Sequence, residues 1–234
     1  MTRTPSKPLL LLDFNGTLVH RTKRRLRGTS PAKINKHYLY PRPGLMDFLQ
    51  NLSPLFSICL YSSAQFRTIE PILTELNINQ HIQRVYDRRY NVRDVEEGEK
   101  PWDTKRDLNK IFDDTPEHDL SSVILVDNEL RKMADFSDNG ILISDYGDQE
   151  VFDKSPAALV QLTEYLTGLG EAWGNQSIND VRQFLLSKPF VENIARPKIT
   201  QEVPSVVLPK RNSFGPRRKF NRNRADKKRA NVSR

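Results

Sequence analysis

The stretch LLLLDFNGTLVH, residues 9–20, decides the fold expected for this chain. Its start belongs to the run PLLLLDF at 8–14, which holds no polar residue before Asp13, as in a strand buried on both faces of a parallel sheet. Gly16 suits a sharp turn after the strand, and the Thr17 hydroxyl can anchor that turn by hydrogen bonding. We therefore expect Asp13 at the carboxyl end of a buried parallel strand.

The chain beyond this stretch alternates between short apolar runs and segments with helical spacing. The runs FSICLY, SSVILVD and GILIS predict strands over 56–61, 121–127 and 140–144. Apolar residues recur with helical spacing over 44–52, 66–77, 104–112, 129–136, 156–168 and 178–187. This alternation predicts a Rossmann-like α/β fold around a mostly parallel sheet.

Three of the four predicted strands end in polar residues. The pairs are Asp13 and Asn15, Ser62 and Ser63, and Asp127 and Asn128. Strand ends are often polar, but ligands of such sheets bind at the carboxyl ends of the strands, where these side chains would meet. The pattern predicts a functional site there.

Composition excludes some classes of protein. The chain has 234 residues and a net charge of +8, and its hydrophobic fraction is 37%. No apolar stretch approaches the roughly 20 residues that a membrane span needs, so we expect no span. Cys59 is the single cysteine, which rules out an intrachain disulfide and fits a reducing compartment.

Positive charge is concentrated at the carboxyl-terminal end. Residues 195–234 contain 13 Lys and Arg against 2 Asp and Glu, a net of +11, which leaves about −3 for residues 1–194. With few large aliphatic residues and no periodicity, 195–234 is predicted to be a disordered basic tail after a folded domain at 1–194. Such a tail could bind RNA, direct nuclear import or add solubility.

Several motifs resemble those of the haloacid-dehalogenase (HAD) superfamily. LLLLDFNGTLVH resembles its first motif, ICLYSSAQF its second, and ILVDNELRKM its fourth. WDTKRDLNKIF, RPGLMDFLQNLS and INDVRQFL resemble the branch that includes RNA polymerase II C-terminal-domain phosphatases, also called NLI-interacting-factor-like. The resemblance runs from about Leu9 to Leu186. It implies a HAD core without a large cap domain.

The same resemblance implies a reaction and a cofactor. Asp13 would attack phosphorus and form an aspartyl phosphate, which splits one difficult step into two. Mg²⁺, which prefers oxygen ligands, would be held by Asp13, the backbone carbonyl of Asn15 and Asn128, with Asp127 acting through water or orienting the site. The implied enzyme is a magnesium-dependent phosphoprotein phosphatase.

Two further residues would contact the phosphoryl group. Ser62 can donate a hydrogen bond to a phosphoryl oxygen, and a lysine adds a fixed positive charge. Lys105 is the preferred lysine, although the branch has Lys directly before Asp-Leu and this chain has Arg106 there. Lys100 and Arg106 therefore remain alternatives.

Asn15 is the largest departure from the superfamily pattern. A second aspartate normally stands there, where it protonates the leaving oxygen and then activates water. An amide has no proton to exchange at neutral pH, and general acid–base catalysis contributes about 10²–10⁴-fold. Two interpretations follow. The chain is a phosphatase, which Asn15 weakens unless another group supplies the proton. Alternatively, it is a pseudophosphatase that binds phosphoprotein or RNA.

The segment between the first two motifs, residues 20–44, is too short for a folded cap and contains a basic run at 21–27. An open site suits a macromolecule, and the run could contact a phosphopeptide or a nucleic-acid backbone, or be a solvated loop. The expected location is the nucleus, with the cytoplasm or mitochondrion as alternatives.

Overall fold

The structure is a computed structural model that describes residues 7–29, 31–94, 100, 102–153 and 157–193. A five-stranded sheet lies at its centre, with every neighbouring pair parallel and the strand order β10-β9-β1-β5-β6. The strands are β1 (Leu9–Leu12), β5 (Ser57–Tyr61), β6 (Arg84–Tyr86), β9 (Val123–Asp127) and β10 (Gly140–Leu142). The predicted parallel α/β fold is confirmed.

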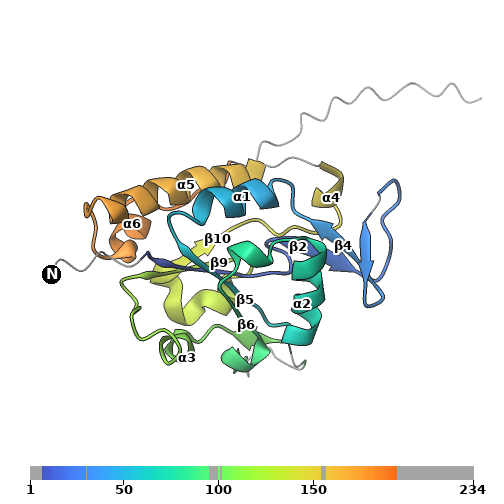
Figure 1. Cartoon of the computed structure of the whole chain (residues 1–234), viewed down its shortest axis with the longest axis horizontal. Helices are drawn as coiled ribbons and strands as arrows, with labels where there is room; N and C mark the ends of the chain where they lie inside the picture. The colour runs from blue at the N-terminus through green and yellow to red at the C-terminus, as the bar shows by residue number, and fades with distance from the viewer. Residues whose placement is uncertain (1–6, 30, 95–99, 101, 154–156, 194–234) are drawn as a thin grey trace, which may run out of the picture. The chain divides into compact units, whose positions relative to one another are not determined.

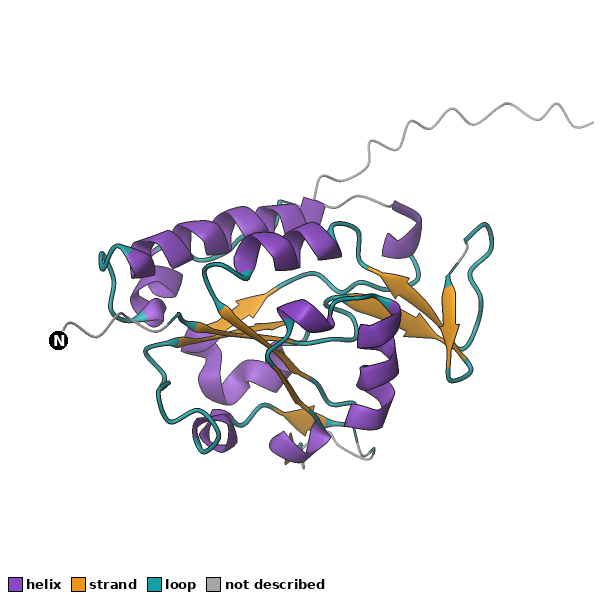
Figure 2. Cartoon of the chain, in the orientation of Figure 1, coloured by secondary structure: helices purple, strands orange, loops and turns teal. Residues whose placement is uncertain are grey.

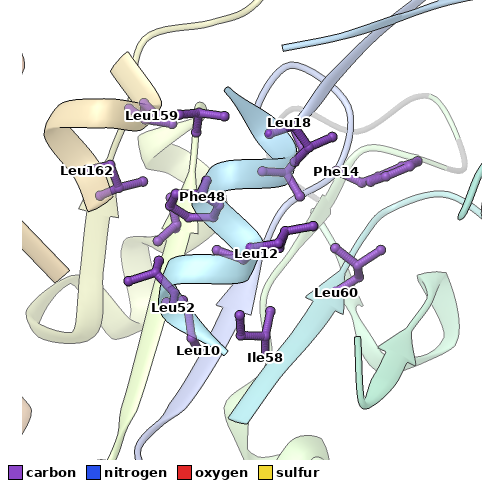
Figure 3. Packing of buried hydrophobic residues seen from close by; sticks show 14 of the residues in the cluster. Leu10, Leu12, Phe14, Leu18, Phe48, Leu52, Ile58, Leu60, Leu159 and Leu162 are labelled. Atoms are coloured by element: carbon purple, nitrogen blue, oxygen red, sulfur yellow. The ribbon is translucent and has the colours of Figure 1, made fainter. Parts of the chain in front are cut away.

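Both faces of the sheet are covered, which explains the unbroken apolar character of β1. Leu10 and Leu12 pack into the larger core, whereas Leu9 and Leu11 pack into a second core on the opposite face. Successive side chains of a strand point to opposite faces, so a strand covered on both sides needs apolar residues throughout. Figure 3 shows Leu10 and Leu12 among the side chains of the larger core, with Phe48, Leu52, Leu159 and Leu162.

The helices form two layers around the sheet (Figure 1). The larger core contains side chains from α1 (Leu45–Leu52), α2 (Phe66–Glu75), α5 (Ala157–Gly174) and α6 (Val181–Ser187). The second core contains side chains from α3 (Leu108–Phe112) and the 3₁₀ segment η3 (Leu130–Asn139). The remaining helical segments are η1 (Asn79–His81), η2 (Arg88–Tyr90) and α4 (Glu150–Asp153). None of the helices within the described ranges is long and apolar enough to span a membrane.

Residues 20–44 contain regular structure that the sequence did not predict. A three-stranded antiparallel sheet forms there, in the order β2-β4-β3, from β2 (Val19–Thr22), β3 (Ala32–Ile34) and β4 (His37–Pro41) (Figure 2). A β-bridge between Asn15 and Val19 places β2 directly after the polar loop. The strands are short and the basic residues of the segment are mostly exposed, so its apolar residues do not alternate with a clear period. Its sequence is therefore equally compatible with a loop.

The helix predicted over 104–112 is wrong in its first half. β8 (Thr104–Lys105) pairs antiparallel with β7 (Val92–Arg93), and α3 begins only at Leu108, where the Asp107 carboxylate accepts a hydrogen bond from the Asn109 amide. β6 was not predicted as a strand. The predicted tail, and with it the boundary between residues 194 and 195, lies outside the described residues.

Candidate active site

Parallel strands bring the predicted polar residues to one edge of the sheet. β1 lies between β5 and β9, with Leu12 opposite Leu60 and Val126, so Asp13, Ser62 and Asp127 lie at the ends of three neighbouring strands. The Asp13 amide donates to the Val126 carbonyl at 2.8 Å, which extends the pairing by one residue. The location of the site therefore follows from strand order alone.

Asp13 lies in a buried network of charged side chains. It is 3% exposed, and its Oδ1 accepts a hydrogen bond from Arg106 Nη2 at 2.6 Å. The Nε and Nη2 of Arg106 also donate to Asp127 Oδ2, at 3.0 and 2.6 Å, and its Nη1 donates to Asn91 Oδ1 at 2.9 Å. One guanidinium thus bridges the two carboxylates. Asp13 Oδ2 is buried and has no hydrogen-bond partner.

The contact with Asp13 is made by Arg106, which the sequence analysis kept as an alternative to Lys105. Thr104 and Arg106 are buried and flank the more exposed Lys105, as expected where successive side chains of a strand point to opposite sides. The Lys100 ammonium lies 5.8 Å from the ring centre of Trp102. Arg106 immediately precedes Asp-Leu, as the lysine does in the resembled branch, so it replaces Lys105 in our interpretation of the site.

The charges around Asp13 shift its proton affinity. Burial and the neighbouring Asp127 raise the pKa of Asp13 to about 6, while Arg106 and Lys132 act in the lowering direction. Burial alone would lower the pKa of Arg106, but the carboxylates of Asp127 and Asp13 outweigh it and raise that pKa. A pKa of about 6 leaves Asp13 mostly ionised at neutral pH, which is the form that a carboxylate would need to act as a nucleophile.

The end of β5 carries hydroxyl groups. Ser62 is 1% exposed, and its Oγ accepts a hydrogen bond from the Ala64 amide at 3.2 Å. Ser63 Oγ and Thr104 Oγ1 lie 2.8 Å apart, which ties the end of β5 to β8. The Ser62 hydroxyl is not used up by this single bond, because its proton can still be donated.

The loop after β1 packs closely on the loop after β9. Gly16 has a φ of +88°, and a Cβ there would lie 2.5 Å from Asn128 Nδ2 and 2.6 Å from Asp145 Oδ1. Thr17 Oγ1 donates to Asn128 Oδ1 at 3.2 Å, and Asn128 Nδ2 donates to Asp145 Oδ1 at 2.6 Å. Only glycine fits both the backbone angle and the close approach.

Asn15 and Asp13 offer oxygens that suit a hard cation. Asn15 Oδ1, like Asp13 Oδ2, is buried without a hydrogen-bond partner, which normally costs free energy. Within the described ranges no three His, Cys, Asp or Glu side chains form a metal cluster. The Asp13 carboxylate, the Asn128 amide and the Asn15 backbone carbonyl nevertheless offer a mixed set of oxygens, and oxygen ligands are those that Mg²⁺ prefers. The residues present therefore fit this cation.

An open cleft of about 710 Å³ lies above these residues. Its floor is formed by the chain neighbours of the three strand-end residues, namely Asn15, Gly16, Ser63, Ala64, Asn128 and Glu129. Its walls include basic side chains from β2, η2 and η3: Arg21, Arg88, Arg131 and Lys132. Such a cleft is open to a macromolecule and presents basic side chains that could contact an anion.

Lys132 is a basic residue of the site that sequence reasoning missed. It is only 7% exposed, its Nζ lies 2.5 Å from Glu129 Oε1, and its backbone carbonyl accepts from the Arg106 amide at 2.8 Å. A lysine after Asp-Asn in a segment with helical spacing is usually solvated, so the sequence held no signal for its burial.

Comparison with known proteins supports this description. The sequence model of NLI interacting factor-like phosphatase matches residues 8–182. Nuclear envelope morphology protein 1 of Schizosaccharomyces pombe is 25% identical over 193 residues, covering 79% of this chain and 36% of the relative. An uncharacterised FCP1 homology domain-containing protein of the same yeast is 26% identical over 155 residues, covering 61% and 63%.

A third similar protein carries the name of a mitochondrial import component. The mitochondrial import inner membrane translocase subunit TIM50 of Gibberella zeae is 26% identical over 158 residues, covering 67% of this chain and 26% of the relative. This chain therefore spans less than two thirds of each of these three relatives.

Solved structures share the fold. Fcp1, described as an essential RNA polymerase II CTD phosphatase, superposes with a TM-score of 0.56 at 14% identity, covering 77% of this chain and 70% of Fcp1. The fission yeast Fcp1 bound to beryllium fluoride gives a TM-score of 0.53 at the same identity and coverage.

Proposed function

Because the chain belongs to the NLI interacting factor-like phosphatase family, we propose that it removes phosphate from phosphoproteins through Asp13, and does so slowly. The observation that carries this proposal is the state of Asp13. Its carboxylate is buried at the carboxyl edge of the sheet, one oxygen is held by Arg106, and the other has no hydrogen-bond partner. Such a carboxylate is fixed in place and still able to bond to phosphorus.

The proposed reaction has two steps. An Asp13 oxygen attacks phosphorus, the bond from phosphorus to the serine or threonine oxygen breaks, and the leaving oxygen takes up a proton. Water then attacks the aspartyl phosphate, which releases inorganic phosphate and a proton and restores the Asp13 carboxylate. Arg106 holds Asp13 in place and balances its charge, and the Ser62 hydroxyl can donate to a phosphoryl oxygen.

Asn15 limits both steps of this reaction. At the position where the superfamily carries an acid, the amide can neither protonate the leaving oxygen nor take a proton from the attacking water. In the proposed mechanism the proton must come from solvent, which reaches the open cleft. A loss of about 10²–10⁴-fold in rate is the expected cost of that substitution.

Mg²⁺ is the proposed cofactor, with Asp13, the Asn15 backbone carbonyl and Asn128 as ligands, and Asp127 outside the direct ligand set. When bound, this ion would offset the negative charge of the transferred phosphoryl group. The hydrogen bonds from Thr17 to Asn128 and from Asn128 to Asp145 fix the amide in one orientation, with its oxygen toward Thr17.

The proposed partners and location rest on charge and on the relatives. The open cleft, walled by the small sheet, suits a phosphoprotein, and the basic run on and after β2 would help to hold an acidic segment. RNA binding by residues 195–234 stays a prediction from composition. We favour the nucleus, as the name of the nuclear envelope relative supports, with the mitochondrion as the alternative that the TIM50 relative supports.

Capture of a phosphoryl analogue tests the proposed nucleophile separately from turnover. Beryllofluoride should bind Asp13 only when Mg²⁺ is present, giving bound fluorine signals and a higher melting temperature. Asp13→Asn should abolish both, whereas Asp148→Asn, which changes an exposed carboxylate, should abolish neither. A complex that survives Asp13→Asn, or the absence of any Mg²⁺-dependent complex, would remove Asp13 from this role.

A second candidate function is phosphoprotein binding without hydrolysis. It is favoured by Asn15 together with the ion pairs that Arg106 makes with both Asp13 and Asp127. In that case the wild-type protein binds phosphopeptide and forms the beryllofluoride complex, but it releases no phosphate over hours. The Asn15→Asp variant then releases no phosphate either.

A further inference from the structure

The basic side chains of the cleft fall into two groups by their partners. Arg131 lies 2.7 Å from Asp94 and 3.1 Å from Glu129, and Lys132 pairs with Glu129 as well. In contrast, Arg21 and Arg88 have no carboxylate within 4 Å in the described part of the chain. The first group is neutralised by the protein itself, whereas the second is available to an anionic ligand.

Arg21 is the more unusual of the two. Its side chain is half-buried on β2, and its Nη2 lies 3.2 Å from His37 Nδ1 on β4. Burial lowers the pKa of this guanidinium, and no carboxylate offsets that effect. A charge that has lost part of its hydration without gaining a counter-ion costs free energy, which an anion in the cleft would recover.

Arg21 lies farther along β2 than the loop that carries Asp13 and Asn15. The bridge between Asn15 and Val19 anchors the start of β2 beside the reactive loop, and Arg21 comes two residues later, about 7 Å farther along the strand. Arg88, by comparison, donates through Nε to the Ser63 carbonyl at 2.7 Å, at the end of β5. Arg21 thus lies on the small sheet, whereas Arg88 is bonded to the end of β5.

We propose that Arg21 is a specificity-determining residue that binds a second anionic group of the substrate, two or three residues from the phosphorylated one. This inference rests on the proposed phosphoprotein function and names its substrate class: phosphopeptides that carry a neighbouring phosphoserine, phosphothreonine, aspartate or glutamate. An extended peptide advances about 3.3–3.6 Å per residue, so two residues cover about the same length as the step along β2 from Val19, which is bridged to Asn15, to Arg21. The His37 ring lies beside the guanidinium, while its Nδ1 also lies 3.0 Å from the Asn35 carbonyl, so the described residues of the cleft leave Arg21 without a committed acceptor.

The other charges of the cleft favour a peptide over a nucleic acid. The cleft is also lined by Asp103, Glu129 and Asp145. A nucleic-acid backbone carries a charge at every nucleotide and would meet these carboxylates, whereas a peptide can place two negative groups and leave neutral residues between them. Discrete anion positions therefore fit the cleft better than a continuous polyanion.

A cycle of peptides and variants tests the inference by binding alone, without turnover. The affinity of the full chain is measured by fluorescence anisotropy, with Mg²⁺, for three peptides that share one sequence: unphosphorylated, phosphorylated once, and phosphorylated again two residues away. We expect the second phosphate to tighten binding to the wild-type protein about tenfold, as for one charge-assisted hydrogen bond.

Arg21→Gln should remove that tenfold gain and change the affinity for the singly phosphorylated peptide by less than about twofold. Arg21→Lys should keep most of the gain because the charge remains. Arg24→Gln is the matched control on the same segment: Arg24 is exposed and pairs with Asp148, so the gain should persist. Melting temperatures confirm that each variant is folded.

The outcomes separate this inference from the proposed function. A second phosphate that adds nothing in the wild-type protein, or a gain that survives Arg21→Gln, overturns the role of Arg21 while phosphate-dependent binding stands. Equal binding of phosphorylated and unphosphorylated peptides overturns the phosphoprotein function as well. Arg21-dependent binding of a single-stranded RNA, tighter than that of either phosphopeptide, would assign Arg21 to nucleic acid.

Discussion

The interior of the site and the rim of its cleft use arginine in opposite ways. Arg106 is 1% exposed and bonded to Asp13, Asp127 and Asn91, so its charge is fully occupied within the protein. The rim is the group formed by His20, which lines the cleft, and by Asp148 and Arg24 beyond it; Arg24 is 78% exposed and shares Asp148 with His20. A buried charge must have partners before folding is favourable, whereas an exposed one is already solvated by water.

This difference indicates where changes to charge will matter. At the strand ends, one guanidinium faces two buried carboxylates, so the network is short of positive charge even before a phosphoryl group enters. A cation or a proton at this position is therefore favoured. At the rim, ions and water screen each pair, and single charges can change with little effect on stability.

The largest effect is expected from Asn15→Asp, which adds a carboxyl group next to the buried network. Hydrolysis of an aryl phosphate with Mg²⁺ should rise by about 10²–10⁴-fold, since the new group can protonate the leaving oxygen and then activate water. Steady-state release of phosphate measures this change.

Asn15→Gln is the matched control for that variant, because it keeps an amide and should bring no increase. If the wild-type protein already turns over as fast as Asn15→Asp, another group supplies the proton and Asn15 does not limit the reaction. An inactive Asn15→Asp that still binds beryllofluoride would favour the binding function.

Arg106→Met should have the next largest effect, on stability. The substitution leaves Asp13 and Asp127 buried without their shared partner, which costs about 3–5 kcal/mol in the free energy of unfolding. Urea unfolding at pH 7.5 measures the loss, and Arg106→Lys should recover part of it. The loss should be smaller at pH 5, because Asp13, with a pKa of about 6, then takes up a proton. A loss below about 1 kcal/mol at pH 7.5 would mean that the buried pair is weakly coupled to folding.

Much of this site could be predicted from the sequence because it depends on strand ends. The apolar run before Asp13 and the run before Asp127 place both carboxylates at the same edge of a parallel sheet, whatever the details of the helices. The roles of Gly16 and Thr17 could be predicted for a similar reason, because glycine favours the turn and the threonine hydroxyl can form the hydrogen bond.

The parts that could not be predicted depend on contacts between distant segments. Arg106 reaches Asp13 across 93 residues of sequence, and its position depends on the short β7–β8 pairing just before it and on the hydrogen bond from its amide to the Lys132 carbonyl. The burial of Lys132 likewise depends on where the 3₁₀ segment packs. The small sheet escaped notice because three-residue to five-residue strands with exposed basic side chains carry little periodic signal.

An intermediate effect is expected at Asp87, a buried carboxylate with local partners. Burial alone would raise the pKa of Asp87, but hydrogen bonds from the Arg89 side chain and from the amides of Phe66 and Arg89 lower it. The charged form is therefore stabilised in the folded protein. Asp87→Asn should cost about 1–3 kcal/mol at pH 7, because the charge is lost and the NH₂ group replaces one of the two oxygens that accept hydrogen bonds from Phe66 and Arg89.

The pH dependence of this cost gives the test at Asp87. A carboxylate with a lowered pKa stabilises the fold above its unfolded value, 3.8, and loses that contribution as the pH falls through the lower folded value. Unfolding free energies of wild type and Asp87→Asn should therefore differ at pH 6–7, and the difference should narrow only as the pH falls below 3.8 and through the lowered folded pKa of Asp87. A difference that stays constant over this range would show that the charge of Asp87 contributes nothing.

The smallest effect is expected at the rim, from Arg24→Gln. The hydrogen bonds from His20 and Arg24 lower the pKa of Asp148, but the Arg24–Asp148 pair is open to water. Exposed pairs contribute about 0.2–1 kcal/mol and are screened by salt, so the unfolding free energy should fall by less than about 0.5 kcal/mol at 0.15 M salt. Because Asp148 keeps its contact with His20 at 2.7 Å, removing Arg24 leaves no carboxylate without a partner. A loss as large as that of Arg106→Met would show that the rim is as strongly coupled to folding as the buried network, and would remove the distinction between the two regions.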